Sequence, residues 1–442
     1  MISKQGIIVC LTFEPIVEVS YMQNVKISVL GLGHIGLPTA LLFASAGHNV
    51  VGIDTDKRKV DLLNSGELPF QESGLDELFK KAKNNFRATT EVEESDVFLI
   101  AVPTPLEERT KAADLRYVKS AAEMIWPHLK KGNLVILEST VPPKTTERIL
   151  VPILEKSGLK AGEDFYVVHC PERAIPGKTI YEIVHNDRII GGITPESAEV
   201  AKKLYASFVK GNIYLTDATT AEFVKLIENT YRDVNIALVN ELAQIAEDYG
   251  INIWEAIELA NKHPRVNLHK PGPGVGGHCI AIDPWFVIQN SSNGRMISLA
   301  RYINDTMPNY VLRKVREMLK DIHFPTVTVF GVAYKGNVDD ARETPALRFI
   351  KLAENDGFKI KVYDPLVKEF EYPLLSLEEA VKDSDCIVVI TDHEVFKFLD
   401  PEEIGRLMRH KFVFDGRNIL DHKKWKKAGF TVKVLGNGKE IL

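Results

Sequence analysis

Short apolar runs alternate with amphipathic stretches over the first half of the chain. Val25–Leu30 and Asn49–Ile53 have the pattern of buried strands, and Gly36–Ala46 between them has helical spacing. Three more apolar runs of strand length follow, at Ser95–Val102, Leu134–Glu138 and Phe165–His169. Strands that alternate with helices form mainly parallel sheets with helices on both faces, so this pattern predicts an α/β domain.

The pattern changes near Asp217. From residue 217 to 262, Gly and Pro are almost absent and apolar side chains recur at helical spacing. The positions that form this apolar stripe are Phe223, Leu226, Ile227, Tyr231, Val234, Leu238, Leu242 and Ile245. The spacing predicts one long helix that joins domains and offers a surface for dimer formation. More helix is expected from Ser291 to Leu319.

A second alternating unit begins at Thr326. Its expected strands and helix are Thr326–Phe330, Pro345–Asn355 (the helix), Lys359–Tyr363, Cys386–Thr391 and Phe412–Asp415. The predicted fold class is therefore α/β, with two Rossmann-like, doubly wound domains joined by an all-α central domain that contains a long helix. We place these domains at residues 25–216, 217–320 and 321–442. Residues 1–24 form an N-terminal extension in which Met22 is an alternative start.

Composition restricts the class of protein. A chain of 442 residues exceeds one ordinary core, and a formal net charge of -5 gives no sign of a nucleic-acid binder. The four cysteines lie far apart without CxxC spacing, which disfavours disulfides and a zinc site and fits a reducing compartment. The sequence also lacks an apolar run of membrane-spanning length and a signal-peptide cleavage site. We therefore expect a cytoplasmic protein with no metal and no membrane partner.

A glycine-rich turn follows the first predicted strand. The run Gly31-Leu-Gly33-His34-Ile35-Gly36 opens a helix whose N-terminal N–H groups can bind a pyrophosphate, and its glycines let that group approach the backbone. Asp54 ends the next strand, 18 residues after Gly36, where a ribose-binding acid belongs. This acid favours NAD over NADP, and Lys59 is placed to flank the adenosine ribose.

Two threonines follow further apolar strands. Thr104 lies in AVPTP and Thr140 in ESTVPP, both just after the carboxyl end of a predicted strand. In such sheets the carboxyl ends of the strands face the ligand crevice, so both residues are candidates for cofactor or substrate contact. The alternative is that each hydroxyl caps the following turn.

The most unusual stretch is the run from Pro271 to Phe286, PGPGVGGHCIAIDPWF. Its glycines give a backbone that can wrap an anion, and Cys279 follows them directly. Cys279 is therefore a candidate exposed nucleophile, with a buried, inert thiol as the alternative. Asp283 shares a face with Cys279 if a helix begins there. A carboxylate would raise the thiol pKa, so we expect Asp283 to move a proton or orient water.

Lys225 and Asn229 lie four residues apart on the predicted long helix and share a face. An ammonium beside an amide can stabilise an alkoxide or an oxyanion. The alternative is an ordinary solvated helix face.

Together these motifs resemble the UDP-glucose/GDP-mannose dehydrogenase family, in the family's order and over nearly the whole chain after about residue 25. The matching stretches are GLGHIGLPTA, AVPTP, ESTVPP, HCPERAIPG, EFVKLIENTYRDVNIALVNELA, GPGVGGHCIAIDPWF, GVAYKGNVDDARETPA, VYDP and FDGR. Within the family, the cysteine motif is most similar to the branch that acts on UDP-N-acetyl-D-mannosamine.

The resemblance implies an N-terminal NAD domain, a helical dimer-forming middle and a C-terminal domain for the UDP-sugar. It implies NAD as cofactor, a UDP-N-acetylhexosamine as substrate and a homodimer or higher homo-oligomer with a shared active site. It also implies four-electron oxidation of the C6 hydroxymethyl to a carboxylate. Cys279 would hold the sugar first as a thiohemiacetal and then as a thioester, which water hydrolyses.

Residue roles also follow from the resemblance. Lys225 and Asn229 would stabilise the oxyanion, Thr140 would bind a water, Asp283 would move a proton and Glu172 would serve as general acid–base. Arg342 would reach toward the cofactor or substrate, and Arg265 would come from the neighbouring subunit. The implied substrate-binding residues are Glu172, Arg173, Lys225, Asn229, Arg232, Arg265, Gly276, His278, Tyr334, Lys335 and Arg417.

Other functions remain open from the sequence. UDP-N-acetylglucosamine and UDP-glucose are alternative substrates. A two-electron dehydrogenase of the 3-hydroxyacid or 6-phosphogluconate type also joins a Rossmann domain to helices, but it uses no catalytic thiol. A non-catalytic nucleotide sensor would bind NAD without turnover.

Overall fold

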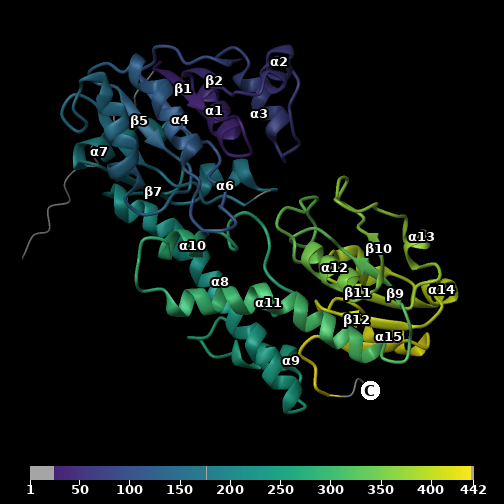
Figure 1. Ribbon diagram of the computed structural model, residues 1–442. Helices are drawn as coiled ribbons and strands as arrows, with labels where there is room; N and C mark the ends of the chain where they lie inside the picture. The colour runs from purple at the N-terminus through teal and green to yellow at the C-terminus, as the bar shows by residue number, and fades with distance from the viewer. Residues whose placement is uncertain (1–23, 176, 440–442) are drawn as a thin grey trace, which may run out of the picture. The chain divides into compact units, whose positions relative to one another are not determined.

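A computed structural model describes residues 24–175 and 177–439, so residues 1–23 of the predicted N-terminal extension lie outside the described part (Figure 1). The chain forms two compact units. The first combines the residues up to Val102 with Ser120–Glu138 and Thr146–Ala218. The second combines Pro103–Lys119, Ser139–Thr145 and the chain from Thr219 onward. The predicted boundary at residues 320 and 321 falls inside this second unit.

The first unit is built on an eight-stranded sheet in the order β3-β2-β1-β4-β5-β6-β7-β8, parallel except for the β6–β7 pair. Its strands are β1 Lys26–Leu30, β2 Asn49–Ile53, β3 Phe86–Thr89, β4 Val97–Ile100, β5 Leu134–Leu137, β6 Tyr166–His169, β7 Arg188–Gly192 and β8 Ile213–Asp217. The helices of this part of the chain are α1 Gly36–Ser45, α2 Lys57–Ser65, α3 Leu75–Ala82, α4 Arg116–Ile125, α5 Val151–Leu154, α6 Thr179–His185 and α7 Pro195–Tyr205. Short 3-10 turns at Trp126–His128 and Glu155–Ser157 and a π turn at Thr146–Leu150 complete it.

Burial explains why the central strands of this sheet read as continuous apolar runs. Every residue of β4 and of β5 is buried, as expected for parallel strands that are covered on both faces. Helix α1 is buried along almost its whole length, from Gly36 to Ala44. Helix α1, which the glycine-rich turn opens, is therefore part of the core of the unit.

The helical part of the second unit corrects one prediction. Instead of one helix over residues 217–262, the structure has α8 (Ala218–Asp248) and a separate α9 (Ile253–Ala260). Gly250 adopts a φ of 67°, a left-handed conformation that ends α8, and the Asn252 side chain then caps α9 by accepting from the Trp254 N–H at 3.1 Å. Apolar periodicity continues across this break, which is why periodicity alone missed it.

Helix α8 packs against α11 (Arg295–Met318), and the two helices cross in Figure 1. Arg301 on α11 is buried and forms an ion pair with Asp233 on α8. The amide of Asn240 donates to that of Asn304 at 2.9 Å. A short helix, α10 (Asp283–Ile288), precedes α11. These buried polar contacts fix the register of the two long helices.

A second, five-stranded parallel sheet follows in the order β10-β9-β11-β12-β13. Its strands are β9 Thr326–Phe330, β10 Lys359–Tyr363, β11 Cys386–Val389, β12 Phe412–Asp415 and β13 Thr431–Val434. The remaining helices are α12 Pro345–Asn355, α13 Leu377–Val381, α14 Pro401–Leu407, α15 His422–Lys427 and a 3-10 turn at Glu394–Phe398. This strand order places the topological switch point between β9 and β11, where ligands bind in open α/β sheets. The predicted fold class is confirmed.

The two sheets repeat one local plan. Gly31 and Gly331 both have positive φ, and each donates its N–H to the last residue of the neighbouring strand at 2.8 Å, Ile53 and Tyr363 respectively. The following N–H groups donate to an acid just after that strand, Asp54 in the first sheet and Asp364 in the second. The plan diverges afterwards, because α1 begins at Gly36 whereas α12 begins only at Pro345.

Candidate active site

The glycine-rich turn has the shape that a dinucleotide pyrophosphate requires. A Cβ on Gly36 would overlap the carbonyl oxygen of Gly31, so only glycine lets α1 start this close to β1. A Cβ on Gly33 would meet no atom within 4 Å, so the backbone there faces open space. No side chain caps the N-terminus of α1 at Ile35, which leaves its positive end for an anion. These features fit NAD.

Asp54 lies where the ribose acid is expected. Its Oδ2 accepts the Leu32 N–H at 3.0 Å and an ion pair from Lys59 at 2.7 Å, and its Oδ1 accepts the Asp56 N–H. Burial by itself raises the pKa of Asp54, but these hydrogen bonds outweigh it and the pKa is lowered. The carboxylate is therefore ionised and oriented, with Lys59 paired to it; the predicted contact of Lys59 with the ribose stays a prediction.

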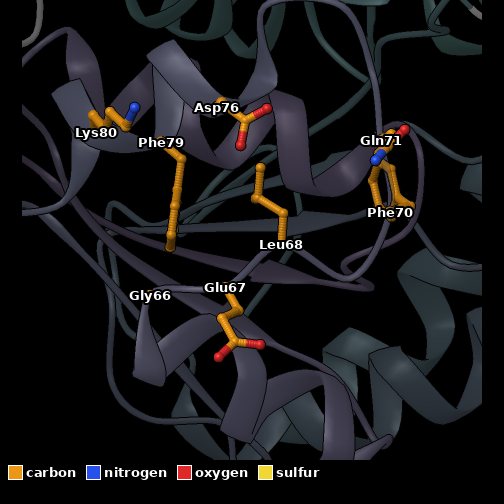
Figure 2. Close-up of a pocket in the computed structure, with 8 residues that line it drawn as sticks. All are labelled: Gly66, Glu67, Leu68, Phe70, Gln71, Asp76, Phe79 and Lys80. Atoms are coloured by element: carbon orange, nitrogen blue, oxygen red, sulfur yellow. The ribbon is translucent and has the colours of Figure 1, made fainter.

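A pocket in the first unit lies beside this turn. Figure 2 shows its lining, with the carboxylates of Glu67 and Asp76 on opposite sides of Leu68. The residues that line it are Gly66, Glu67, Leu68, Phe70, Gln71, Asp76, Phe79 and Lys80. None of them is a predicted site residue. The pocket is connected to the turn through Phe70, whose ring lies 4.3 Å from that of His34.

In the second unit, the glycine loop is held against the segments around it. The Gly272 N–H donates to Asn240 of α8 at 2.8 Å, and the Gly277 N–H donates to the Arg342 carbonyl at 3.2 Å. Gly277 has a φ of 81° and lies against the Tyr334 ring, so a side chain there would clash. The loop needs glycine both for its backbone angles and for this close packing.

Four of the predicted catalytic residues, all in this unit, come together: Cys279, Lys225, Asn229 and Asp283. The Asp283 N–H donates to the Cys279 carbonyl at 2.9 Å, which is one helical turn and places the two side chains on one face, as predicted. Asn229 donates its amide to the Asp283 carboxylate and accepts from Arg232. Lys225, one turn earlier on α8, is buried and contributes to the electrostatics of both Cys279 and Asp283.

The electrostatics of this cluster favour proton transfer. Burial raises the pKa of Asp283 to about 6, against the lowering effects of Lys225, Asn229 and Arg232. Burial also raises the pKa of the Cys279 thiol, while Lys225 opposes that rise. Cys279 nevertheless reaches solvent, whereas Cys170 and Cys386 are buried. Of the cysteines that the structure describes, Cys279 is thus the one accessible to a substrate.

The two predicted threonines meet each other. The Thr104 hydroxyl donates to the Thr140 carbonyl at 2.6 Å, so it joins two loops rather than capping its own turn. Both loops belong to the second unit. The Ala113 N–H donates to Gln289 at 2.9 Å, just after α10. Thr140 is half-buried, and the role of its hydroxyl stays a prediction.

Arg342 forms a planar, two-pronged ion pair with Asp340, with N–O distances of 2.6 to 3.0 Å. The pair lies beside the cysteine loop, because the Arg342 carbonyl accepts the Gly277 N–H at 3.2 Å. Burial lowers the pKa of His278, and the Arg342 charge lowers it further. Sequence reasoning missed Asp340. Its only signal was an acid two residues before the predicted arginine.

Arg417 also reaches the glycine loop. Its guanidinium lies against Gly272, where a Cβ would overlap it, and its Nε donates to the Ile390 carbonyl at 2.8 Å. Pro273 of the same loop packs on Gly416. Lys335 is exposed in the loop after β9. Of the predicted UDP-sugar residues, Arg417 and Tyr334 therefore lie against the loop that carries Cys279.

Glu172 lies in the first unit in a buried ionic cluster that the sequence did not predict. It forms an ion pair with Arg188 of β7 at 2.6 Å, and Arg188 also lies 3.5 Å from Glu138. Burial raises the pKa of Glu172, but Arg188 and two backbone N–H groups outweigh it and the pKa is lowered. Burial raises the pKa of Glu138 to about 7. Arg188 thus holds Glu172 as a carboxylate.

Two further predicted arginines have no described contact with the glycine loop. Arg173 bonds the Asp187 carbonyl in the first unit, and Arg265 is exposed after α9. In residues 24–175 and 177–439, no group of three or more His, Cys, Asp or Glu side chains is arranged to hold a metal ion. Within the same residues, no helix has both the length and the apolar surface that crossing a membrane requires.

Comparison with known proteins decides the family. Three profiles match in order: the family's NAD binding domain at residues 25–209, its central domain at residues 219–306 and its UDP binding domain at residues 328–422. The chain belongs to the UDP-glucose/GDP-mannose dehydrogenase family. It is therefore an NAD-dependent UDP-sugar dehydrogenase, and the predicted family, cofactor and enzyme class are confirmed.

Several members of the family are similar over nearly their full length. A UDP-N-acetyl-D-mannosamine dehydrogenase from Methanococcus maripaludis is 52% identical over 93% of this chain and 97% of its own. The solved structure of a UDP-D-ManNAc dehydrogenase from Pyrococcus horikoshii is 45% identical, covers 94% of this chain and 100% of its own, and has a TM-score of 0.88. A UDP-N-acetyl-mannosamine dehydrogenase structure from Staphylococcus aureus is 43% identical, covers 93% and 99%, and has a TM-score of 0.85.

Proposed function

We propose that this enzyme oxidises C6 of UDP-N-acetyl-D-mannosamine to give UDP-N-acetyl-D-mannosaminuronate. The chemistry rests on one observation, the convergence of Cys279, Lys225, Asn229 and Asp283 at the glycine loop. The choice of sugar is supported by the similar proteins from M. maripaludis, P. horikoshii and S. aureus, all of which carry that name.

The reaction balances as one alcohol, two NAD⁺ and one water giving a carboxylate, two NADH and three protons. The Gly31–Gly36 turn and Asp54 would hold NAD, which would supply the hydride acceptor for both oxidations. The Cys279 thiolate adds to C6 at the aldehyde level and forms a thiohemiacetal. A second oxidation gives a thioester, which water cleaves to the carboxylate and the free thiol.

The remaining residues stabilise charge and move protons. Lys225 stabilises the oxyanion on the C6 oxygen, and Asn229 holds the Asp283 carboxylate in place. Asp283, with a pKa of about 6, accepts a proton at neutral pH and returns it. Thr140 positions a water, and ionised Glu172 acts as a base in the hydrolytic step.

The loops of the second sheet provide residues for substrate binding. Tyr334, Lys335 and Arg417 bind the UDP part, with the two cations meeting the diphosphate charge. Arg342 contributes charge beside the cofactor or substrate, and Arg173 and Gly276 contact the sugar. Arg232, or a side chain near His278, contacts the N-acetyl group at C2 of the sugar.

A panel of UDP-sugars with NAD tests this proposal. We expect fastest turnover with UDP-N-acetyl-D-mannosamine, two NADH per sugar and a product with the mass of the uronate. Faster turnover of UDP-N-acetylglucosamine or UDP-glucose would reassign the substrate. One NADH per sugar would indicate two-electron chemistry, and NAD binding without turnover of any sugar would indicate a sensor.

We further propose a homodimer formed along α8. Its apolar stripe remains exposed at Phe223, Ile227, Tyr231, Leu238 and Ile245, with exposed fractions of 40 to 54%. A monomer rarely exposes a continuous apolar stripe of this length. Arg265 would then enter the neighbouring active site.

The cytoplasm is the proposed location. The described cysteines Cys170, Cys279 and Cys386 are free thiols, and a catalytic thiol persists in a reducing compartment.

A further inference from the structure

The acid after β10 differs from its counterpart in the first sheet. Asp54 is paired with the partly exposed Lys59, whereas the Asp364 side chain is fully buried beside the fully buried His393, 3.0 Å away. Asp364 also accepts the N–H groups of Val332 and Ala333, at 2.7 and 3.2 Å, and two further N–H groups of its own turn. The ribose-binding position is thus filled by the protein's own imidazole.

The hydrogen bonds of His393 define its protonation. Its Nδ1 accepts the Asn337 N–H at 3.0 Å, and a ring nitrogen that accepts carries no proton. The proton therefore lies on Nε2 and is donated to Asp364. Burial raises the pKa of Asp364, but these donors lower it to about 2, so the acceptor is a carboxylate. His393 is a neutral bridge between β10 and the loop after β9.

That loop, residues 331–337, carries Tyr334 and Lys335 and has no regular structure. Because α12 starts only at Pro345, the loop lacks the helix that supports the equivalent turn in the first sheet. It is held instead by the segment after β11. The Thr391 hydroxyl donates to the Ala333 carbonyl at 2.6 Å, and the Glu394 N–H donates to the Asn337 side chain at 2.9 Å.

We propose that His393 is a positioning residue for UDP-sugar recognition, which it serves by bridging Asp364 to the Asn337 N–H and so fixing the loop that bears Tyr334 and Lys335. This inference rests on the proposed role of that loop in binding UDP. His393 touches neither the substrate nor the reacting atoms, so it sets substrate affinity and leaves the chemical step unchanged.

Two substitutions separate the two hydrogen bonds. His393→Gln keeps a donor near Nε2 for Asp364 and loses the acceptor for Asn337. His393→Asn keeps an acceptor near Nδ1 and loses the donor to Asp364. We expect H393Q to raise the Kd for UDP and the KM for the UDP-sugar about tenfold, the effect of one strong hydrogen bond, with kcat and the KM for NAD unchanged. H393N should bind UDP more tightly than H393Q but unfold at a lower temperature.

The two variants should thus rank in opposite orders for UDP affinity and for unfolding temperature. If His393 served stability alone, the variant with the lower unfolding temperature would also bind UDP more weakly. Wild-type UDP affinity in H393Q, or affinities that follow the unfolding temperatures, would overturn the inference. His410→Gln is the matched control, since His410 pairs with Asp385 at 2.7 Å just before β11, at the opposite end of the sheet. It should leave UDP binding unchanged. Failure of the wild type to bind UDP would instead refute the proposed function.

Discussion

At the scale of single residues, Asp283 shows how the site trades stability for chemistry. The side chain is 2% exposed, and burial raises its pKa to about 6 from a usual 3.8. A carboxylate with that pKa exchanges protons readily near neutral pH, which a normal aspartate does not. The same burial makes its charged form unfavourable in the folded protein.

Replacing Asp283 by Asn should remove one limb of the pH profile. If ionised Asp283 accepts the proton, wild-type kcat/KM falls as pH drops below about 6. The D283N variant should be slower by about 10²–10⁴ and lack this inflection, because an amide does not titrate. The measurement is kcat/KM for the UDP-sugar between pH 5 and 8. An inflection that persists unchanged in D283N would assign it to another group.

The same variant should be more stable than the wild type above pH 6. Both folded and unfolded states are protonated below the unfolded pKa of 3.8, so Asp283 has no effect there. Stability is lost as pH rises through about 6, by about 3 kcal/mol at 1.36 kcal/mol per pKa unit. Denaturant unfolding at pH 4 and 7.5 checks this. A stability difference between D283N and wild type that is equal at both pH values would contradict it.

Cys279→Ser should stop uronate formation. A serine hydroxyl is a far weaker nucleophile than a thiolate, and loss of a covalent nucleophile lowers kcat by about 10³-fold or more. UDP affinity should change by less than about twofold, because the thiol is proposed to act on C6 and not on the nucleotide. Turnover of C279S at the wild-type rate would refute the covalent route.

At the scale of elements, the two strand–turn units show how one plan serves two ligands. In the first, Gly36 lets α1 start at the turn, and the helix N-terminus is available to phosphate. In the second, Gly336 packs on the backbone of Asp392 and the chain continues as a loop to Pro345. We propose that Lys335 on that loop provides the positive charge that a helix dipole provides in the first unit.

Substitutions at two glycines of the first turn should affect NAD binding and stability separately. Gly33→Ala places a methyl group in open space, so it should leave the unfolding temperature nearly unchanged while weakening NAD binding. Gly36→Ala forces a clash with Gly31 and should destabilise the fold by about 1–3 kcal/mol. Calorimetric NAD titration and thermal unfolding measure the two effects. Equal NAD affinity in G33A and wild type would argue against pyrophosphate binding at this turn.

At the scale of the whole molecule, the exposed stripe of α8 is the proposed dimer surface. Leu238 lies on this stripe and is 46% exposed. Leu238→Glu should therefore leave the fold intact while converting a dimer to a monomer, since a charge is unfavourable in an apolar interface. Light scattering gives the mass. If Arg265 completes the active site of the neighbouring subunit, the L238E variant should lose activity as it loses the dimer. A wild type that is monomeric by light scattering would rule out this interface.

The sequence predicted much of the fold and the chemistry. The strands β2, β9, β10 and β12 and the helix α12 begin and end at the predicted residues. Local signals carry such elements, because apolar runs and caps are read within a few residues. The break between α8 and α9 was missed, since it depends on the conformation of Gly250 and not on apolar periodicity. The residues Arg188, Asp340 and His393 were missed because each acts through a partner distant in the fold or unremarkable in sequence.

The sequence by itself determined which chemical groups are present and which short turn or helix carries each of them. Gly31–Gly36 before a helix, Cys279 after a glycine loop and Lys225 one turn from Asn229 are patterns within a few residues, and covalent geometry dictates them. Only the tertiary structure decided which groups meet and how they ionise. The raised pKa of Asp283, the Arg188 pairing of Glu172 and the bridge made by His393 all depend on burial and on long-range contacts. Neither has any local signature along a chain.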